Sequence, residues 1–336
     1  MKKSYLKDMV AYKPNQIDAD IVLSANESKN YLFQEGTLFN QDTSRYPEAN
    51  ADSLRKALAK TWGLNYNHFI IGNGSTELLE LMVKTYVNQK DVILTFEPSF
   101  SMYRVYAKIY NASLETVEIE QDGRMNMASF IEKAKEVKPK LIFLCSPNNP
   151  TGSMVKREDI MSLMLQTDAI VVVDEAYMDF ADDSETMVKY VNAYDRLIVA
   201  RTFSKAFGLA AYRIGYLVSN PSIIKDLLSI KLPYNVNQAS IEVGKIALSK
   251  TKKVKAFISE TMETRDYVIN TLKDLNMVVY PSQGNFVFIK SDQNLYDILL
   301  SRGILIRSFN NNTYRMSIGS IDEMKQVIAI LKEALS

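Results

Sequence analysis

A lysine followed by an arginine eight residues later is the most reactive combination in this sequence. Lys205 comes shortly after 197–200, an apolar run typical of a buried strand. Two hydroxyl residues, Thr202 and Ser204, stand beside the lysine. A lysine amine forms a Schiff base with an aldehyde, while hydroxyls and the planar fork of Arg213 hold a phosphate. The pattern predicts a site for a phosphorylated aldehyde cofactor; the alternative is a surface lysine on a turn.

Four short runs, which are apolar throughout, predict the sheet that would position this lysine: 92–95, 141–145, 170–173 and 197–200. Uniformly apolar strands are covered on both faces, which is typical of a mostly parallel sheet between helices. Ligands of such sheets bind at the carboxyl ends of the strands. We therefore expect the residues that follow the four runs to gather there: Phe100, Asn149, Asp174, Tyr177, Thr202, Ser204 and Lys205.

These residue types suit a pyridine ring. Asp174 can hold a ring nitrogen in its protonated form, which makes the ring an electron sink. Asn149 and Tyr177 can hydrogen-bond a ring oxygen, and Phe100 can stack on the ring face. Singly, each has an ordinary structural explanation as a helix cap, a turn residue or a core aromatic. Their occurrence at successive strand ends favours a binding site.

The segment that begins at Gly72 is a second candidate for anion binding. Gly72 and Gly74 permit a tight turn, and Ser75 or Thr76 is expected to cap the following helix. The first N–H groups of a helix attract anions, although a plain strand-turn-helix connection has the same pattern. A dinucleotide fingerprint is disfavoured because Glu77 stands where its third glycine belongs.

A nucleotidase function is also disfavoured. The run 171–175 resembles the magnesium-binding strand of P-loop nucleotidases, but the required Gly-x4-Gly-Lys-Ser/Thr loop is missing from the sequence. Gly244 and Lys245 are followed by isoleucine and lack the upstream glycine. The lone His68 has no cluster of metal-ligand residues around it, so we expect it to be structural and expect no metal.

The composition is that of an ordinary globular chain. With 336 residues, 47% hydrophobic, the length suggests about two domains. The net charge of +1 gives no bias toward nucleic acid or an anionic membrane, and no apolar run reaches membrane-spanning length. Cys145 is the single cysteine, which excludes a disulfide framework and suggests a reducing, cytoplasmic location.

The sequence changes character beyond residue 218. Long helical periodicity covers 223–232 and 237–272, and shorter strand candidates at 277–280, 285–289 and 314–318 precede a final helix at 321–335. We expect a large α/β domain over 31–232, and a smaller α+β domain formed by 1–30 and 233–336. Arg307 and Arg315 lie in the smaller domain with no acid between them, which favours an anion clamp over two solvated charges.

Together, Asn149-Pro-Thr-Gly152, Asp174-x-x-Tyr177 and Ser204-Lys205 followed by Arg213 resemble the motifs of the class I/II pyridoxal-phosphate aminotransferases of fold type I. Within that class the sequence is most similar to histidinol-phosphate aminotransferases. That similarity rests on further segments: Tyr12-Lys-Pro14, Asn26-Glu27, Arg45-Tyr-Pro47, Gly72-Asn-Gly-Ser75, Asn285-Phe286, Gly303-Ile-Leu-Ile-Arg307 and Tyr314-Arg-Met-Ser-Ile-Gly319.

The resemblance implies a role for each matching residue. Lys205 would carry pyridoxal 5'-phosphate and move the proton, with Asp174 at the pyridinium and Tyr177 with Asn149 at the ring oxygen. Cofactor-binding residues would also include Phe100 and, around the phosphate, Ser75, Thr76, Thr202, Ser204 and Arg213. Tyr46 would reach the cofactor phosphate of the neighbouring subunit, which implies a homodimer with shared active sites. Substrate would be bound by Tyr12, Asn26, Arg307 and Arg315.

The resemblance also implies a reaction in amino-acid biosynthesis. An amino group would pass between a phosphorylated amine or amino acid, with histidinol phosphate favoured, and a 2-oxo acid such as 2-oxoglutarate. Two alternatives stay open, a decarboxylase of the threonine-phosphate type and an aminotransferase for aromatic or other amino acids. The bond that breaks is the one held perpendicular to the ring, so orientation decides between them.

Overall fold

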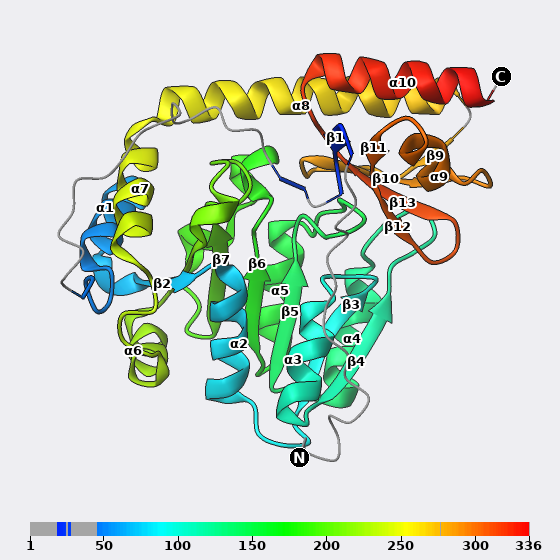
Figure 1. Ribbon diagram of the computed structural model, residues 1–336. Coiled ribbons are helices and arrows are strands. Elements are labelled where there is room, and N and C mark those ends of the chain that lie inside the picture. The colour runs from blue at the N-terminus through cyan, green and yellow to red at the C-terminus, as the bar shows by residue number, and fades with distance from the viewer. Residues whose placement is uncertain (1–18, 25, 28–45, 276, 336) are drawn as a thin grey trace, which may run out of the picture.

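The protein is described from a computed structural model, which describes residues 19–24, 26–27, 46–275 and 277–335 (Figure 1). Its helices are α1 Asp52–Trp62, α2 Ser75–Tyr86, α3 Met102–Tyr110, α4 Met127–Val137, α5 Arg157–Gln166, α6 Pro221–Ile230, α7 Gln238–Ser249, α8 Thr251–Asp274, α9 Leu295–Leu300 and α10 Ile321–Leu335. None of the helices in these ranges has both the length and the apolar character needed to cross a bilayer.

A seven-stranded sheet of order β2-β8-β7-β6-β5-β3-β4 forms the centre of the molecule. Its strands are β2 Phe69–Asn73, β3 Val92–Glu97, β4 Ser113–Glu118, β5 Leu141–Cys145, β6 Ile170–Asp174, β7 Leu197–Thr202 and β8 Ile214–Ser219. The neighbours from β4 to β7 run parallel, and β8 runs antiparallel to both β7 and β2. The parallel arrangement predicted from the four apolar runs is confirmed.

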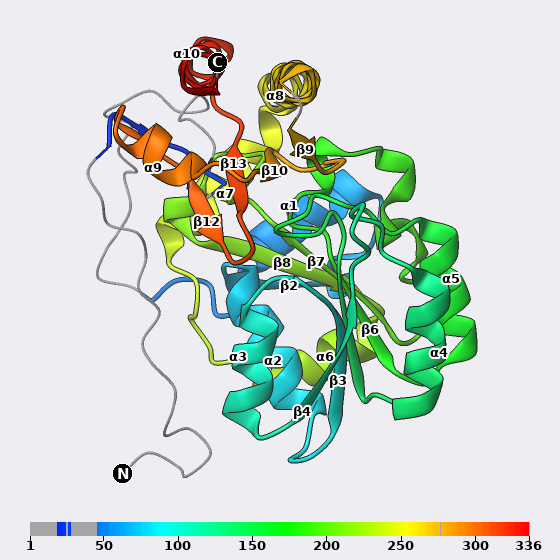
Figure 2. The ribbon, with the colours of Figure 1, turned by 90° about the vertical axis from the view of Figure 1, so that its right-hand side faces the viewer.

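Helices cover both faces of this sheet, which explains why its central strands are apolar throughout. On one face, α2, α3 and α6 bury residues such as Leu79, Tyr103 and Ile224. On the other face, α1, α4, α5 and α7 bury residues such as Leu58 and Phe130. Figure 2 shows α2 and α3 on one side of the strands, with α4 and α5 on the other.

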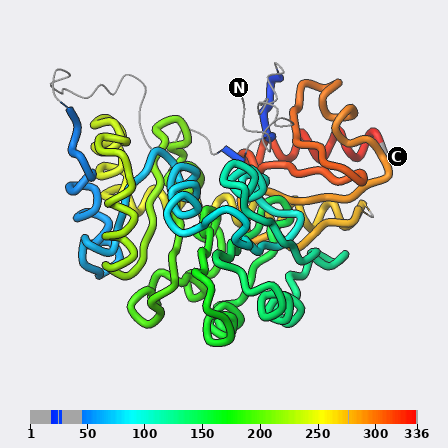
Figure 3. Tube along the Cα trace, turned by 90° about the horizontal axis from the view of Figure 1, so that it is seen from below, coloured from blue at the N-terminus to red at the C-terminus, as the bar shows by residue number. Residues whose placement is uncertain are grey.

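A second sheet of order β12-β13-β10-β9 lies beyond the large sheet and has its own hydrophobic core beneath α8 and α10. Its strands are β9 Val278–Val279, β10 Phe286–Lys290, β12 Arg307–Phe309 and β13 Thr313–Ser317. Next to it, β1 Ile21–Val22 pairs in parallel with β11 Ile304–Leu305. In Figure 3 this C-terminal part gathers at one end of the molecule and α1 at the other. The domain boundary at residue 232 stays a prediction.

Candidate active site

A cavity of about 420 Å³ lies at the carboxyl ends of the central strands, within the size range of small-molecule sites. Register explains why the predicted residues meet here, because Cys145 of β5 pairs with Asp174 of β6, and Asp174 pairs with Ala200 of β7. The strands therefore end at nearly the same level. Most of the predicted site residues line the cavity: Ser75, Thr76, Phe100, Asn149, Asp174, Tyr177, Thr202, Ser204, Lys205, Arg213, Arg307 and Arg315.

The start of α2 and the Arg213 side chain form one end of the cavity. The expectation that Ser75 or Thr76 caps α2 is wrong: Gly74, with φ 80°, is the N-cap and provides no side-chain cap. Arg213 Nη2 lies 3.5 Å from Thr76 Oγ1. A cation at the positive end of a helix is unfavourable without an anion between them. Thr202 and Ser204 add hydroxyls nearby, and the whole arrangement fits a phosphate.

Two glycines allow this close packing. A Cβ added to Gly74 would lie 3.0 Å from the Arg213 guanidinium carbon. A Cβ added to Gly215 of β8 would lie 2.5 Å from the carbonyl carbon of Gly74, so a side chain there would displace the start of α2. Gly215 also pairs with Thr202 of β7. The segment with Ser75 and Thr76 therefore lies beside the segment with Thr202 and Ser204.

Lys205 lies on the cavity wall in a cationic environment. Its Nζ is 5.6 Å from the centre of the Tyr177 ring. Burial lowers the pKa of Lys205 to about 8, and the charges of Arg315 and Arg213 act in the same direction, against Glu27 and Asp174. A lysine with a pKa near neutrality is partly uncharged at physiological pH. It can therefore attack an aldehyde or accept a proton.

Asp174 is the buried acid of the cavity, with an exposed fraction of 3%. Tyr103 Oη donates a hydrogen bond to Asp174 Oδ2 at 2.9 Å, and the Ala176 N–H donates to Oδ1 at 3.2 Å. Burial raises the pKa of Asp174 to about 6, although both hydrogen bonds and Lys205 oppose the rise. A protonated pyridine nitrogen would supply the cation that this buried carboxylate favours.

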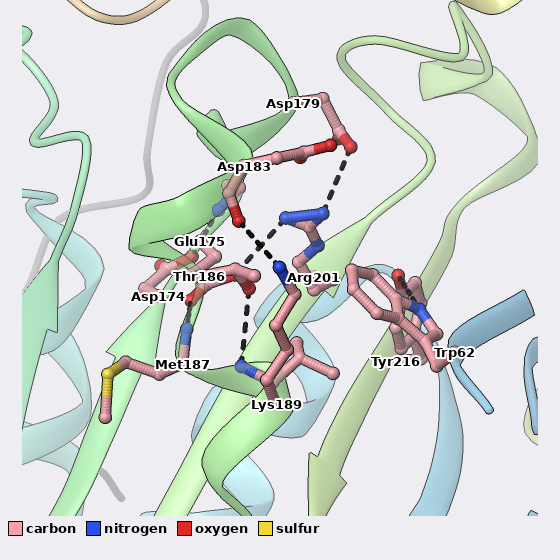
Figure 4. A network of polar contacts seen from close by, with 12 residues as sticks. Trp62, Asp174, Glu175, Asp179, Asp183, Thr186, Met187, Lys189, Arg201 and Tyr216 are labelled. Atoms are coloured by element: carbon pink, nitrogen blue, oxygen red, sulfur yellow. Dashed lines mark hydrogen bonds and ion pairs between the residues drawn. The ribbon is translucent and has the colours of Figure 1, made fainter. Parts of the chain in front are cut away.

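A network on the other side of Asp174 fixes the ends of β6 and β7 (Figure 4). Glu175, fully buried, accepts from Thr186 Oγ1 at 2.7 Å and from the Met187 N–H at 2.7 Å. Arg201 pairs with Glu175 at 3.2 Å and with Asp179 at 3.1 Å. Burial raises the pKa of Glu175, and the Arg201 charge counteracts that rise. Because Glu175 follows Asp174 and Arg201 precedes Thr202, this pair holds two cavity residues in place.

The two predicted arginines lie directly opposite each other. Arg307 of β12 pairs in register with Arg315 of β13, so both side chains leave the same face of the sheet. Arg315 also donates to Asn149 Oδ1, and to the Ser24 carbonyl at 2.8 Å. Like charges at opposed positions are destabilising, so an anion in the cavity would favour this arrangement.

Two predicted residues do not line the cavity, and a third is not among the residues that the structure describes. Tyr46 has an exposed fraction of 82% and stacks on Tyr234, with ring centres 4.9 Å apart. Asn26, expected at the substrate, is buried and donates from Nδ2 to the Tyr177 hydroxyl at 3.1 Å, so it supports a cavity residue. Tyr12 lies outside the described residues.

Other cavity residues were not predicted from the sequence. Phe309 stands two residues after Arg307 on β12, and that spacing alone could have placed both on one face. Ser24 and Glu27 reach the cavity from the N-terminal segment, where the sequence analysis singled out the Asn26-Glu27 motif but assigned a role to Asn26 alone. Cys145 also lines the cavity, although it is 2% exposed, and burial raises the pKa of its thiol.

The residues of this cavity fit pyridoxal 5'-phosphate. The fit rests on the Arg213 charge at the start of α2, the buried Asp174 carboxylate and the Lys205 amine of lowered pKa. Each favours one part of the cofactor: the phosphate, the ring nitrogen and the aldehyde.

Comparison with known proteins agrees with this fit. Residues 15–331 match the family model for aminotransferase class I and II. The histidinol-phosphate aminotransferase of Caldanaerobacter subterraneus subsp. tengcongensis is 38% identical, over 87% of this chain and 84% of that protein. The enzyme of the same name from Clostridium novyi is 33% identical, over 99% and 97%.

Solved structures have the same fold. The histidinol-phosphate aminotransferase of Sinorhizobium meliloti, in complex with pyridoxal-5'-phosphate, superposes with a TM-score of 0.85 at 25% identity, over 95% of this chain and 91% of that one. The L-threonine-O-3-phosphate decarboxylase of Porphyromonas gingivalis, 23% identical with a TM-score of 0.74 over 86% of this chain and 92% of that one, shares the fold. This chain belongs to the class I and II aminotransferases, is a pyridoxal-phosphate-dependent aminotransferase, and is most similar to the histidinol-phosphate aminotransferases.

Proposed function

We propose that this enzyme transfers the amino group of a phosphorylated amine, with histidinol phosphate favoured, to 2-oxoglutarate. The observation that carries the proposal is the opposed pair Arg307 and Arg315 on the cavity wall. Two guanidinium groups side by side suit a substrate phosphate, or the carboxylate of the second substrate in the return half of the reaction. The identity of the relatives supports the choice of histidinol phosphate.

The chain's own residues would divide the chemistry between them. Bound pyridoxal 5'-phosphate would supply an electrophilic carbon for the substrate amine and a ring that withdraws electrons. Arg213, Thr76 and the start of α2 would hold the phosphate, and Asp174 would keep the ring nitrogen cationic. Lys205 would hold the aldehyde end of the cofactor and act as the base, since a pKa of about 8 leaves part of its amine neutral and able to accept a proton.

A homodimer with shared sites is part of the proposal. Tyr46 is exposed and does not line the cavity of its own subunit, as expected of a residue that serves the partner's site. Tyr234, 46% exposed, stacks on Tyr46, and Leu232 two residues earlier is 69% exposed. Burial of these side chains against a second copy would remove an unfavourable exposed patch.

The test compares phosphorylated with unphosphorylated donors. Purified enzyme is given 2-oxoglutarate and either histidinol phosphate, histidinol or threonine phosphate, and glutamate and carbon dioxide are both measured. We expect glutamate from histidinol phosphate. In Arg307→Gln, kcat/KM for histidinol phosphate should fall about 10- to 100-fold, because a hydrogen bond between charged groups is lost. The value for histidinol should change little.

Arg302→Gln is the matched control, because Arg302 pairs with Glu333 on the surface of the same part of the chain. Exposed pairs contribute little, so this variant should behave as the wild type. An equal loss for both donors in Arg307→Gln would contradict the proposed phosphate grip. Carbon dioxide from threonine phosphate without glutamate would show the decarboxylase instead.

A further inference from the structure

Tyr103 occupies a buried position directly behind the acid of the cavity. It lies in the first turn of α3 and is 1% exposed. Its ring is parallel to that of Phe143 on β5, with centres 4.4 Å apart and an interplanar angle of 2°. This stacking fixes the ring and holds its hydroxyl beside Asp174, to whose Oδ2 it donates at 2.9 Å; the Cys145 thiol is a second polar group at the same hydroxyl.

Tyr103 also contacts Phe100, the residue proposed to stack on the cofactor ring. Phe100 meets Tyr103 edge-on, with centres 5.6 Å apart and an angle of 88°. The Tyr103 N–H donates to the Phe100 carbonyl at 3.1 Å, which makes the two residues parts of one turn. Tyr103 therefore contacts two groups that would touch the cofactor ring, although it does not line the cavity itself.

The hydrogen bond has an electrostatic consequence for Asp174. Burial is the main cause that raises the pKa of Asp174 to about 6, and the Tyr103 hydroxyl is the largest of the opposing causes. Burial, with Asp174 close by, holds the pKa of Tyr103 well above its ordinary value, so the phenol keeps its proton and remains a donor. The pair thus favours a charged carboxylate beside a neutral phenol.

We propose that Tyr103 is a positioning residue that keeps Asp174 ionised and aimed, so that the cofactor's ring nitrogen retains its proton. This inference rests on the proposed role of Asp174 at that nitrogen. Through Tyr103, helix α3 would influence how strongly the cofactor ring withdraws electrons, in addition to packing on the sheet.

The test measures cofactor affinity rather than turnover. Enzyme freed of cofactor is titrated with pyridoxal 5'-phosphate and with its 1-deaza analogue, which has carbon in place of the ring nitrogen, and fluorescence quenching gives Kd. Tyr103→Phe keeps the stacked ring and removes the donor. We expect Kd for pyridoxal 5'-phosphate to rise about 10- to 100-fold, as for a lost hydrogen bond to a charged group, and Kd for the analogue to change less than about threefold.

Tyr110→Phe is the matched control on the same helix. Its hydroxyl donates at 3.2 Å to Glu80, another carboxylate, which lies outside the cavity lining. This variant should leave both Kd values unchanged. Equal weakening of both ligands by Tyr103→Phe would mean that Tyr103 only supports the fold, which would overturn the inference.

Asp174→Asn separates this inference from the proposed function. If Asp174→Asn raises Kd equally for pyridoxal 5'-phosphate and for the 1-deaza analogue, the proposed role of Asp174 is wrong, and the inference about Tyr103 is wrong with it. If Asp174→Asn raises Kd more for pyridoxal 5'-phosphate than for the analogue while Tyr103→Phe raises both equally, only the inference about Tyr103 is wrong. In the Asp174→Asn background, which needs no ionised carboxylate, Tyr103→Phe should change Kd for pyridoxal 5'-phosphate less than about twofold.

Discussion

Replacing Lys205 by methionine should stabilise the cofactor-free protein at neutral pH. Lys205 carries a charge in a site where burial and two arginines disfavour it, and its pKa falls from 10.5 to about 8. A lowered lysine pKa means that folding releases a proton between these two values, so stability rises with pH across that window and is lost as pH falls. Below pH 8 the folded protein bears the full free-energy cost of the buried Lys205 charge.

The size of the effect follows from the shift. A change from 10.5 to about 8 corresponds to roughly 3 kcal/mol at pH 7. The side chain is partly exposed, and solvent reduces the penalty, so we expect a gain of about 1–3 kcal/mol in the free energy of unfolding. At pH 9.5 the gain should shrink to roughly half, because the wild-type lysine is then mostly neutral in the folded state.

Urea denaturation of both proteins at pH 7 and pH 9.5, followed by circular dichroism, measures this difference. Lys231→Met is the matched control, since Lys231 is also a buried lysine with a lowered pKa, and it donates to the Ala49 carbonyl at 3.1 Å, the Leu232 carbonyl at 2.9 Å and Asn235 Oδ1 at 2.9 Å. Its loss leaves three acceptors without their donor and should destabilise by about 1–3 kcal/mol. A Lys205→Met protein less stable than the wild type at pH 7 would refute the electrostatic reasoning.

Two further predictions concern the supports of the site. Arg201→Met should lower the free energy of unfolding by about 3–5 kcal/mol, because it leaves Glu175 as an uncompensated buried charge; a loss below about 1 kcal/mol in urea denaturation would contradict this. Gly215→Ala should weaken pyridoxal 5'-phosphate binding at least about tenfold, because the new Cβ pushes Ser75 and the start of α2 away from Arg213. Unchanged Kd in a fluorescence titration would show that α2 adapts.

Much of the large sheet could be predicted because its central strands are apolar on both sides. The runs that became β3, β5, β6 and β7 have no polar alternation, and only a sheet covered by helices explains this. The edge strand β4 was not predicted. Its sequence, Ser113–Glu118, is polar at four of six positions, and none of its residues is fully buried, so it resembles a loop until its pairing with β3 is known.

The site was predictable to the extent that its residues follow strand ends. Asn149, Asp174 and Lys205 meet for that reason. Contacts that depend on the tertiary path of the chain were not predictable: the Ser24 carbonyl reaches Arg315 across 291 positions. Tyr103 was missed because nothing in a single sequence separates a buried tyrosine that packs from one that also donates to an acid.

The end of β6 places neighbouring carboxylates in opposite environments. Asp174 meets Tyr103 from α3, while Glu175 meets Arg201 and the segment around Thr186. Deleting one residue within this strand would move Glu175 into the cavity position and Ala176 into the structural network, and inserting one would move Asp174 into the network and Val173 to the cavity. Sequence libraries built on this enzyme can therefore vary side chains along β6 but should keep its length constant, and changes in length belong in the surface connections before β7.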